Sequence, residues 1–80
     1  MVICLDPGHG GMDPGAVAGD VREADVALEY ARAIGDALET RGCTVLYTRL
    51  EDKTLELAAR TRAANEAAAD AFLSVHCNAS

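Results

Sequence analysis

The chain has 80 residues, of which 50% are hydrophobic, so it can form one small globular domain or part of one. Thirteen acidic residues against seven basic ones give a formal net charge of −6. This charge argues against nucleic acid or an anionic membrane surface as a partner, because both are bound through excess Lys and Arg. No apolar run is long enough to span a membrane, and no signal peptide is expected before the first predicted strand.

The first predicted element is a short buried strand over residues 2–5, an apolar run bounded by Pro and Gly. A loop rich in Gly and Pro follows over residues 6–16 and holds His9 just past the C-terminal end of the strand. In open α/β sheets, ligands bind at this end of the strands. Because glycine lets the backbone approach a bound group closely, the loop is predicted to present His9 as a functional side chain.

Three interpretations of the loop remain open from its own residues. It could be a plain Gly/Pro turn with a solvated histidine, a phosphate cradle, or part of a metal site. The phosphate cradle fits poorly, because Asp13 stands where a dinucleotide motif needs a small residue and no Walker lysine follows. The metal site requires further ligands from elsewhere in the chain.

Helical periodicity predicts a helix from residue 23 to residue 41, with Gly42 as its C-cap. Its apolar face is predicted to contain four residues at helical spacing: Ala27, Ala31, Ile34 and Leu38. Apolar and β-branched residues at 43–47 predict a second strand.

Thr54 is the predicted N-cap of a second helix that ends near Ala69. The predicted apolar stripe of this helix consists of Leu55, Leu57, Ala58 and Ala64. Residues 71–75 predict a third strand, which ends at His76.

The order β-α-β-α-β with short connections predicts an α/β fold with three layers, α/β/α, and a mostly parallel sheet with right-handed crossovers. The strand order 2-1-3, with one helix on each face, would bring the two histidines together. Because a doubly wound sheet normally continues, residues 1–80 are expected to be the first half of a larger domain. The exposed sheet edge would then invite self-association.

Both histidines of the chain, His9 and His76, follow predicted strands. Two imidazoles and a carboxylate form a zinc site with an open fourth position, as in catalytic zinc sites. Glu23 is the natural third ligand because it begins the helix after the His9 loop, although an acid that stabilises the helix dipole is an equally good interpretation. Asp6 and Asn78 are candidates to accept the other N–H of the metal-binding histidines, or else to cap a strand end.

The three cysteines are an odd number and contain no Cys-x-x-Cys spacing, so a disulfide framework is not expected. Cys4 and Cys77 lie in apolar, strand-like segments. Both are predicted to be buried thiols that neither bind a metal nor form a disulfide.

Several motifs follow one another along the whole chain: Asp-Pro-Gly-His-Gly-Gly-x-Asp-Pro-Gly-Ala at residues 6–16, Glu23, Leu-x-x-Arg at 57–60, Ala-Asn at 64–65, and Asp-Ala-Phe-Leu-Ser-Val-His-Cys-Asn-Ala at 70–79. Together they resemble the zinc-dependent N-acetylmuramoyl-L-alanine amidase family (the Amidase_3 type). The paired histidine motifs are much more specific than a lone Gly-rich loop.

The resemblance implies a peptidoglycan hydrolase that cuts the amide between N-acetylmuramic acid and the L-alanine of the stem peptide. Such an enzyme acts on the cell wall, either as an extracellular or periplasmic autolysin or as a phage lysin made in the cytoplasm. The resemblance also implies one Zn²⁺ bound by His9, Glu23 and His76. Arg60 and Asn65 match the family too and are expected to be structural, holding the second helix to the loops.

The resemblance further implies that residues 1–80 are the N-terminal part of a single amidase catalytic domain. The family's general-base glutamate lies near the end of that domain, so it is expected C-terminal to Ser80, and no catalytic residue is expected within this chain. Because general acid–base assistance is worth about 10²–10⁴-fold, the chain alone is expected to have little or no turnover. The alternatives are a catalytically inert fragment that carries zinc or binds the cell wall, and a nucleotide binder that needs no zinc.

Overall fold

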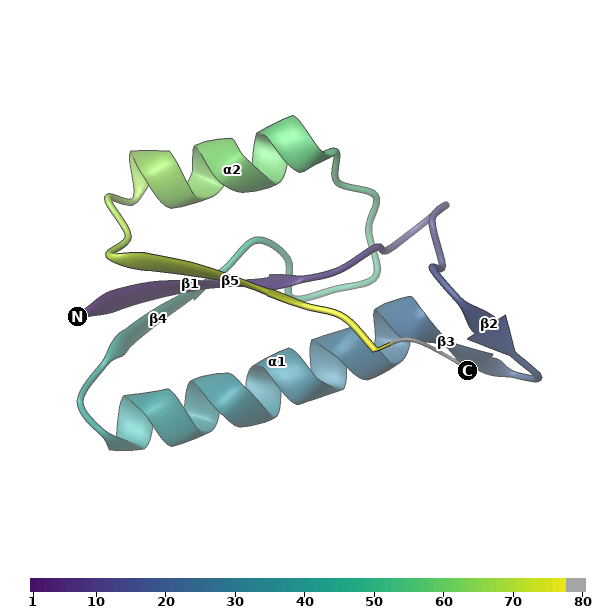
Figure 1. Ribbon diagram of the computed structural model, residues 1–80, viewed down its shortest axis with the longest axis horizontal. Helices are drawn as coiled ribbons and strands as arrows, with labels where there is room; N and C mark the ends of the chain where they lie inside the picture. Colours follow the sequence, from purple (N-terminus) through teal and green to yellow (C-terminus); the bar gives the residue numbers. More distant parts are fainter. Residues whose placement is uncertain (78–80) are drawn as a thin grey trace.

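The structure is a computed structural model that describes residues 1–77 and places a sheet between two helices (Figure 1). The sheet contains three parallel strands: β1 (Val2–Pro7), β4 (Thr44–Tyr47) and β5 (Ala71–Val75). Their order is β4-β1-β5, with α1 on one face and α2 on the other. The predicted α/β/α layers, parallel sheet and strand order 2-1-3 are therefore confirmed.

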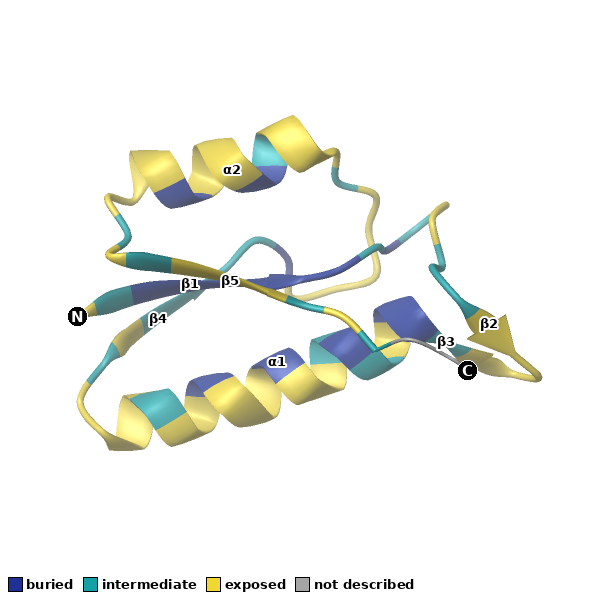
Figure 2. Ribbon diagram, viewed as in Figure 1, coloured by how far each residue is buried: buried dark blue, intermediate teal, exposed yellow. Residues whose placement is uncertain are grey.

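β1 is the core of the molecule and the only strand of the described sheet with a partner on each side. Residues from Ile3 to Pro7 are all buried, and Figure 2 shows β1 as the most continuously buried strand. A strand buried on both faces reads as a continuous apolar run, which explains why the run at residues 2–5 predicted it. This burial fixes the strand end from which the His9 loop begins.

β5 lies at one side of the described sheet and is much more exposed than β1 (Figure 2). The Phe72 and Leu73 side chains are 38% and 48% exposed. The expected self-association through a sheet edge stays a prediction.

α1 (Glu23–Thr40) packs on the sheet through very small residues. After Glu23, its buried positions are Ala24, Ala27, Ala31 and Gly35.

The prediction that Ile34 belongs to this buried face of α1 was wrong, because Ile34 is 41% exposed and Gly35 is buried in its place. A Cβ on Gly35 would lie 2.8 Å from Tyr47 Cζ, so the tyrosine ring fills the space that a side chain would need. The C-cap of α1 is Arg41 and not, as was predicted, Gly42; Gly42 is the next residue and has a φ of +90°.

α2 (Leu57–Glu66) is shorter than predicted at both ends. Its N-cap is Glu56, and the hydroxyl of Thr54, the predicted N-cap, instead accepts a hydrogen bond from the Met12 amide. Ala67 is the C-cap, and the next residue, Ala68, has a φ of +53°. The predicted C-terminal end of α2, near residue 69, was therefore also wrong.

The predicted apolar stripe of α2 is only partly observed. Ala64 is buried, but Ala58 is exposed and Leu57 is 75% exposed. The other buried residue of the helix is Arg60, whose charged group occupies the position facing the loops. Hydrophobic periodicity did not predict the buried face of α2 correctly, because an arginine occupies one of its buried positions. Neither α1 nor α2 combines the length and apolar character that a bilayer-spanning helix requires.

A small antiparallel hairpin between the His9 loop and α1 was not predicted. It consists of β2 (Val17–Ala18) and β3 (Val21–Arg22), which are joined by a turn in which Gly19 has a φ of +60°. Strands of two residues are too short to produce a periodic pattern. The hairpin reverses the chain, so that Glu23 returns to the loop that holds His9.

All three cysteines are free thiols, as predicted. Cys4 is buried, and its burial, together with the nearby Asp6 charge, raises the pKa of the thiol. Cys77 is only half-buried, so the prediction of a fully buried thiol was wrong at that position.

Candidate metal centre

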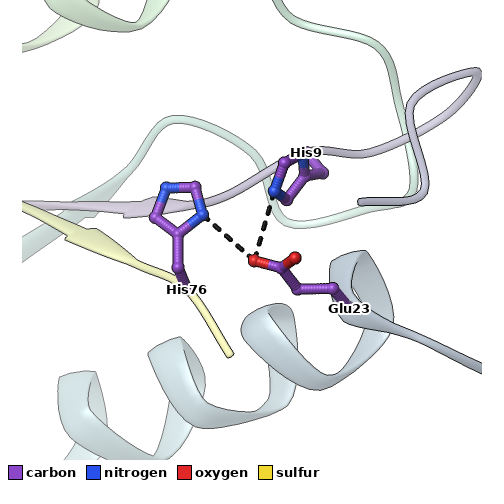
Figure 3. Close-up of side chains that lie close together, drawn as sticks. All are labelled: His9, Glu23 and His76. Atoms are coloured by element: carbon purple, nitrogen blue, oxygen red, sulfur yellow. Dashed lines mark hydrogen bonds and ion pairs between the residues drawn. The ribbon is translucent and has the colours of Figure 1, made fainter. Parts of the chain in front are cut away.

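The structure brings His9, Glu23 and His76 together, as the sequence predicted (Figure 3). His9 follows β1, His76 follows β5, and Glu23 is the first residue of α1. Because β1 and β5 are parallel neighbours, the residues at their C-terminal ends meet at the same edge of the sheet. His9 Nε2 and His76 Nδ1 lie 3.2 Å and 3.1 Å from the same atom, Glu23 Oε2.

The donor atoms of these three residues match the ligand set of a catalytic zinc site. One nitrogen from each histidine and one carboxylate oxygen lie within 4.8 Å of one another. Zinc–ligand bonds of about 2.0–2.2 Å in tetrahedral geometry place donor atoms about 3.3 Å apart. The two Glu23–histidine distances are close to that spacing, so the three residues fit the metal.

The carboxylate of Glu23 is held in one orientation by main-chain amides. The Ala16 amide donates to Oε1 at 3.1 Å, and the Cys77 amide donates to Oε2 at 3.3 Å. The Ala16 hydrogen bond above all, with the His76 and Cys77 contacts and the nearby His9, outweighs the effect of burial and lowers the pKa of Glu23. The carboxylate is therefore ionised and directs Oε2 toward both histidines.

Asp13 orients His9, a role that the sequence analysis missed. Asp13 Oδ2 lies 2.8 Å from His9 Nδ1, while Oδ1 accepts a hydrogen bond from the Gly15 amide. The contact with His9 and then the Gly15 amide lower the pKa of Asp13, so it stays a carboxylate. A proton on Nδ1 donated to Asp13 leaves Nε2 of His9 free to bind a metal. The signal was present in the sequence, as an acid four residues after His9 in the same loop.

Asp6 does not accept a hydrogen bond from either histidine, so its predicted role was wrong. It is buried, and its Oδ1 accepts from Thr48 Oγ1 and Arg60 Nη1, both at 2.7 Å. Its Oδ2 accepts from Ser74 Oγ at 2.7 Å. These donors occupy both oxygens and tie together β1, the end of β4, α2 and β5.

Two predictions about the site concern the end of the chain, outside the described residues. Asn78, the other predicted acceptor for a histidine N–H, lies there. Ser80 lies there too, and the general-base glutamate was expected C-terminal to it. The structure of residues 1–77 therefore tests neither the role of Asn78 nor the position of the base relative to Ser80, and both stay predictions.

Arg60 has the predicted structural role. Besides the Asp6 ion pair, its guanidinium donates to the main-chain oxygens of Pro7 at 2.6 Å and His9 at 2.7 Å. The expectation for Asn65 was wrong, because Asn65 is exposed and the hydrogen bonds from α2 to the loop come from Arg60.

The amides of the Gly-rich loop are occupied by groups of the protein itself. Gly8 N donates to Val75 O, Gly10 N to Asp13 O, and Gly11 N to a carboxylate oxygen of Asp52 at 2.7 Å. A phosphate cradle needs these amides free, and the Asp52 carboxylate would repel an anion. The loop is therefore not built to hold a phosphate.

A cavity of about 220 Å³ lies beside the two histidines. Its walls include His9 and His76 on the polar side, and Leu55 and Leu57 from the start of the α2 region. Leu57 is 75% exposed, so an apolar surface adjoins the donor atoms.

A family model described as N-acetylmuramoyl-L-alanine amidase matches residues 3–80. The chain belongs to the N-acetylmuramoyl-L-alanine amidase family.

A bacterial amidase and a phage endolysin both resemble the chain. It is 46% identical to the N-acetylmuramoyl-L-alanine amidase CwlM of Bacillus licheniformis, over 96% of this chain and 31% of that protein. It is 43% identical to an endolysin of Bacillus phage SPP1, over 98% of this chain and 29% of the endolysin. The chain thus spans less than a third of either relative.

A solved amidase structure has the same fold. The catalytic domain of CwlV, an N-acetylmuramoyl-L-alanine amidase from Bacillus (Paenibacillus) polymyxa var. colistinus, superposes with a TM-score of 0.91 at 34% identity. The match covers 99% of this chain and 46% of the CwlV chain. The chain therefore corresponds in fold to a part of an amidase catalytic domain.

Proposed function

We propose that the chain carries the zinc centre of a peptidoglycan amidase that acts on the cell wall, with His9, Glu23 and His76 as the ligands of one Zn²⁺. The observation that carries the proposal is the convergence of two imidazole nitrogens on one ionised carboxylate, in a chain that belongs to the amidase family. The proposed reaction is hydrolysis of the amide between N-acetylmuramic acid and the L-alanine of the stem peptide.

The residues of the chain prepare this site for the metal. Zinc, when bound, would polarise the scissile carbonyl and lower the pKa of a water toward about 7. Asp13 holds the Nδ1 proton of His9, and the Ala16 amide holds Glu23 with one oxygen toward the histidines. The cavity beside His9 and His76 gives the substrate carbonyl a place next to these donors.

The carboxylates that line the cavity are not available as the base that takes the proton of the attacking water. These are Asp6, which is bound to Arg60, and Asp13, which is bound to His9. Asp52, on the neighbouring loop, is bound to main-chain and side-chain donors of its own. We therefore infer that residues 1–80 form the N-terminal part of the catalytic domain and that another segment of the domain, C-terminal to Ser80, provides the general base.

A chimera tests this function directly. Residues 1–80 would replace the matching N-terminal segment of the CwlV catalytic domain, and release of stem peptides from purified peptidoglycan would be measured at equal zinc loading. We expect the chimera to be active, and residues 1–80 alone to be slower by at least about 10²-fold, the usual lower value for general-base assistance.

The chimera carrying His9→Ala is the matched control and should be inactive. A chimera that folds and binds zinc but releases no peptide would contradict the amidase assignment and favour an inert, zinc-carrying fragment. Equal rates from the chimera and from residues 1–80 alone would place the base within this chain.

Gly15→Ala is expected to disrupt the proposed zinc site by displacing two ligands at once. An added Cβ would lie 2.6 Å from His9 Cδ2 and 2.8 Å from Glu23 Oε1, and the φ of +69° disfavours any side chain. We expect zinc affinity, measured by competition with a chromophoric chelator, to fall by at least about tenfold. Gly19→Ala is the control, because Gly19 also has a positive φ but a Cβ there meets nothing within 4 Å. Equal losses for both variants would show that backbone strain alone, and not displacement of the ligands, is responsible.

A further inference from the structure

Arg49 is a buried arginine that donates only to main-chain carbonyls within residues 1–77. It is 2% exposed and follows β4 closely in sequence. Its Nε donates to Pro7 O at 3.1 Å, and its Nη1 donates to Glu51 O at 3.1 Å. Burial, with the nearby Arg60 charge, lowers the pKa of the guanidinium, so this position is costly for a cation.

One nitrogen of Arg49 connects the two segments that carry His9 and Glu23. Nη2 donates to Gly8 O at 2.8 Å and to Ala24 O at 2.9 Å. Gly8 immediately precedes His9, and Ala24 immediately follows Glu23. Both hydrogens of this single nitrogen are therefore used to hold the two ligand-bearing backbones at a fixed separation.

Arg60 supports the same loop but does not make this connection. It donates to Pro7 O and His9 O from α2, on the other face of the sheet. The contacts of Arg60 fix the loop relative to α2, whereas Arg49 fixes it relative to α1. Of these two arginines, only Arg49 contacts both ligand-bearing segments.

We propose that Arg49 is a positioning residue that sets the separation of His9 and Glu23 and thereby the geometry of the metal centre. This inference rests on the proposed zinc site. The observation that supports it is the pair of hydrogen bonds from Arg49 Nη2 to Gly8 O, just before His9, and to Ala24 O, just after Glu23.

Lysine cannot replace this arrangement, although it keeps the charge. The guanidinium is a planar fork with five donors at fixed angles, whereas an ammonium is a single point on a flexible stem. From the position of Arg49, a lysine nitrogen could not hold Pro7 O, Gly8 O and Ala24 O together. Arg49→Lys therefore separates positioning from charge.

The experiment compares Arg49→Lys with the unaltered chain in two measurements. Zinc affinity is measured by competition with a chromophoric chelator, and the visible absorption spectrum is recorded with Co²⁺ at saturation. We expect zinc affinity to fall by about tenfold or more, as for other residues that orient metal ligands. We also expect the Co²⁺ bands to shift or change intensity, because they report the arrangement of the ligands.

Arg32→Lys is the matched control, because Arg32 also donates to a main-chain oxygen, that of Leu50 at 2.6 Å. We expect this variant to change neither zinc affinity nor the Co²⁺ spectrum.

A second control separates positioning from loss of stability. Ala31→Gly weakens α1 at a buried position that makes no hydrogen bond with Arg49, and affinities are corrected for the folded fraction measured by circular dichroism without metal. Unchanged affinity and spectrum in Arg49→Lys, or an equal corrected loss in Ala31→Gly, would overturn the proposal. Failure of Arg49→Lys to fold even with saturating Co²⁺ would also overturn it, because Arg49 would then be needed for the fold itself. If the unaltered chain binds no zinc, the proposed function fails instead.

Discussion

Replacing either His9 or His76 by alanine is expected to abolish stoichiometric zinc binding. Each histidine offers one of the three donor atoms that lie within 4.8 Å of one another, so each variant leaves only two ligands. The loss should exceed the about 10–100-fold effect of removing a group that only orients a ligand. Zinc content after dialysis, together with affinity from chelator competition, measures the effect.

Cys77→Ser is the matched control for these variants. Cys77 is next to His76, and its main-chain amide, which donates to Glu23, is kept in the serine variant. Its thiol is not among the clustered donor atoms, so zinc binding should be retained. One zinc per chain in the double variant His9→Ala, His76→Ala would rule out the proposed ligand set.

Arg60→Met is expected to destabilise the zinc-free chain by about 3–5 kcal/mol, the usual cost of breaking a buried ion pair by removing one partner. Asp6 would remain buried with only Thr48 and Ser74 as side-chain donors, and Pro7 O and His9 O would each lose a hydrogen bond. A loss of that size approaches the whole stability of a small domain, about 5 kcal/mol at the lower end. Urea denaturation of the metal-free chain measures the change.

The double variant Asp6→Asn, Arg60→Met is the control for the charge. Removing the carboxylate charge as well should recover part of the loss, because no unpaired charge then remains buried. A loss below about 1 kcal/mol for Arg60→Met alone would show that the pair contributes no more than an exposed one.

The same ion pair makes stability depend on pH in a defined direction. Burial alone would raise the pKa of Asp6, but the hydrogen bonds from Arg60, Thr48 and Ser74 outweigh it and lower the pKa. The unfolded chain, with an ordinary pKa of about 3.9, then binds the proton first as the pH falls. The contribution of Asp6 is therefore complete above that value and is lost as the pH falls through the lower, folded-state pKa. Asp6→Asn should lose less stability than the unaltered chain over this acid range.

The sequence was sufficient for the three-stranded sheet and its order because the strongest patterns of the chain are local. The apolar run of β1 identifies the central strand, and the two histidines at strand ends require β1 and β5 to be neighbours. The ligand candidates followed from residue type and from their places at strand ends and at the start of a helix. The prediction of the buried face of α2 was wrong, because Arg60, and not an apolar residue, occupies one of its buried positions.

The partners of the site could not be predicted, because they depend on the path of the loop. Gly10 and Gly11, both with positive φ, turn the chain so that Asp13 reaches His9. Asp6 lies as close to His9 in sequence, but β1 directs its side chain toward donors on α2 and β5. Distance along the chain did not distinguish these two acids, and only the backbone conformation does.

His76 lies 53 residues after Glu23 and reaches it only when β5 pairs with β1. A metal ion held by both would therefore act as a crosslink that closes a long loop, and the free energy of binding would become free energy of folding. The segment secured in this way is β5, the more exposed neighbour of the central strand. Pairing of β5 with β1 would then complete the proposed ligand set, and a chain in which β5 is not yet paired would hold only His9 and Glu23 of the three proposed ligands.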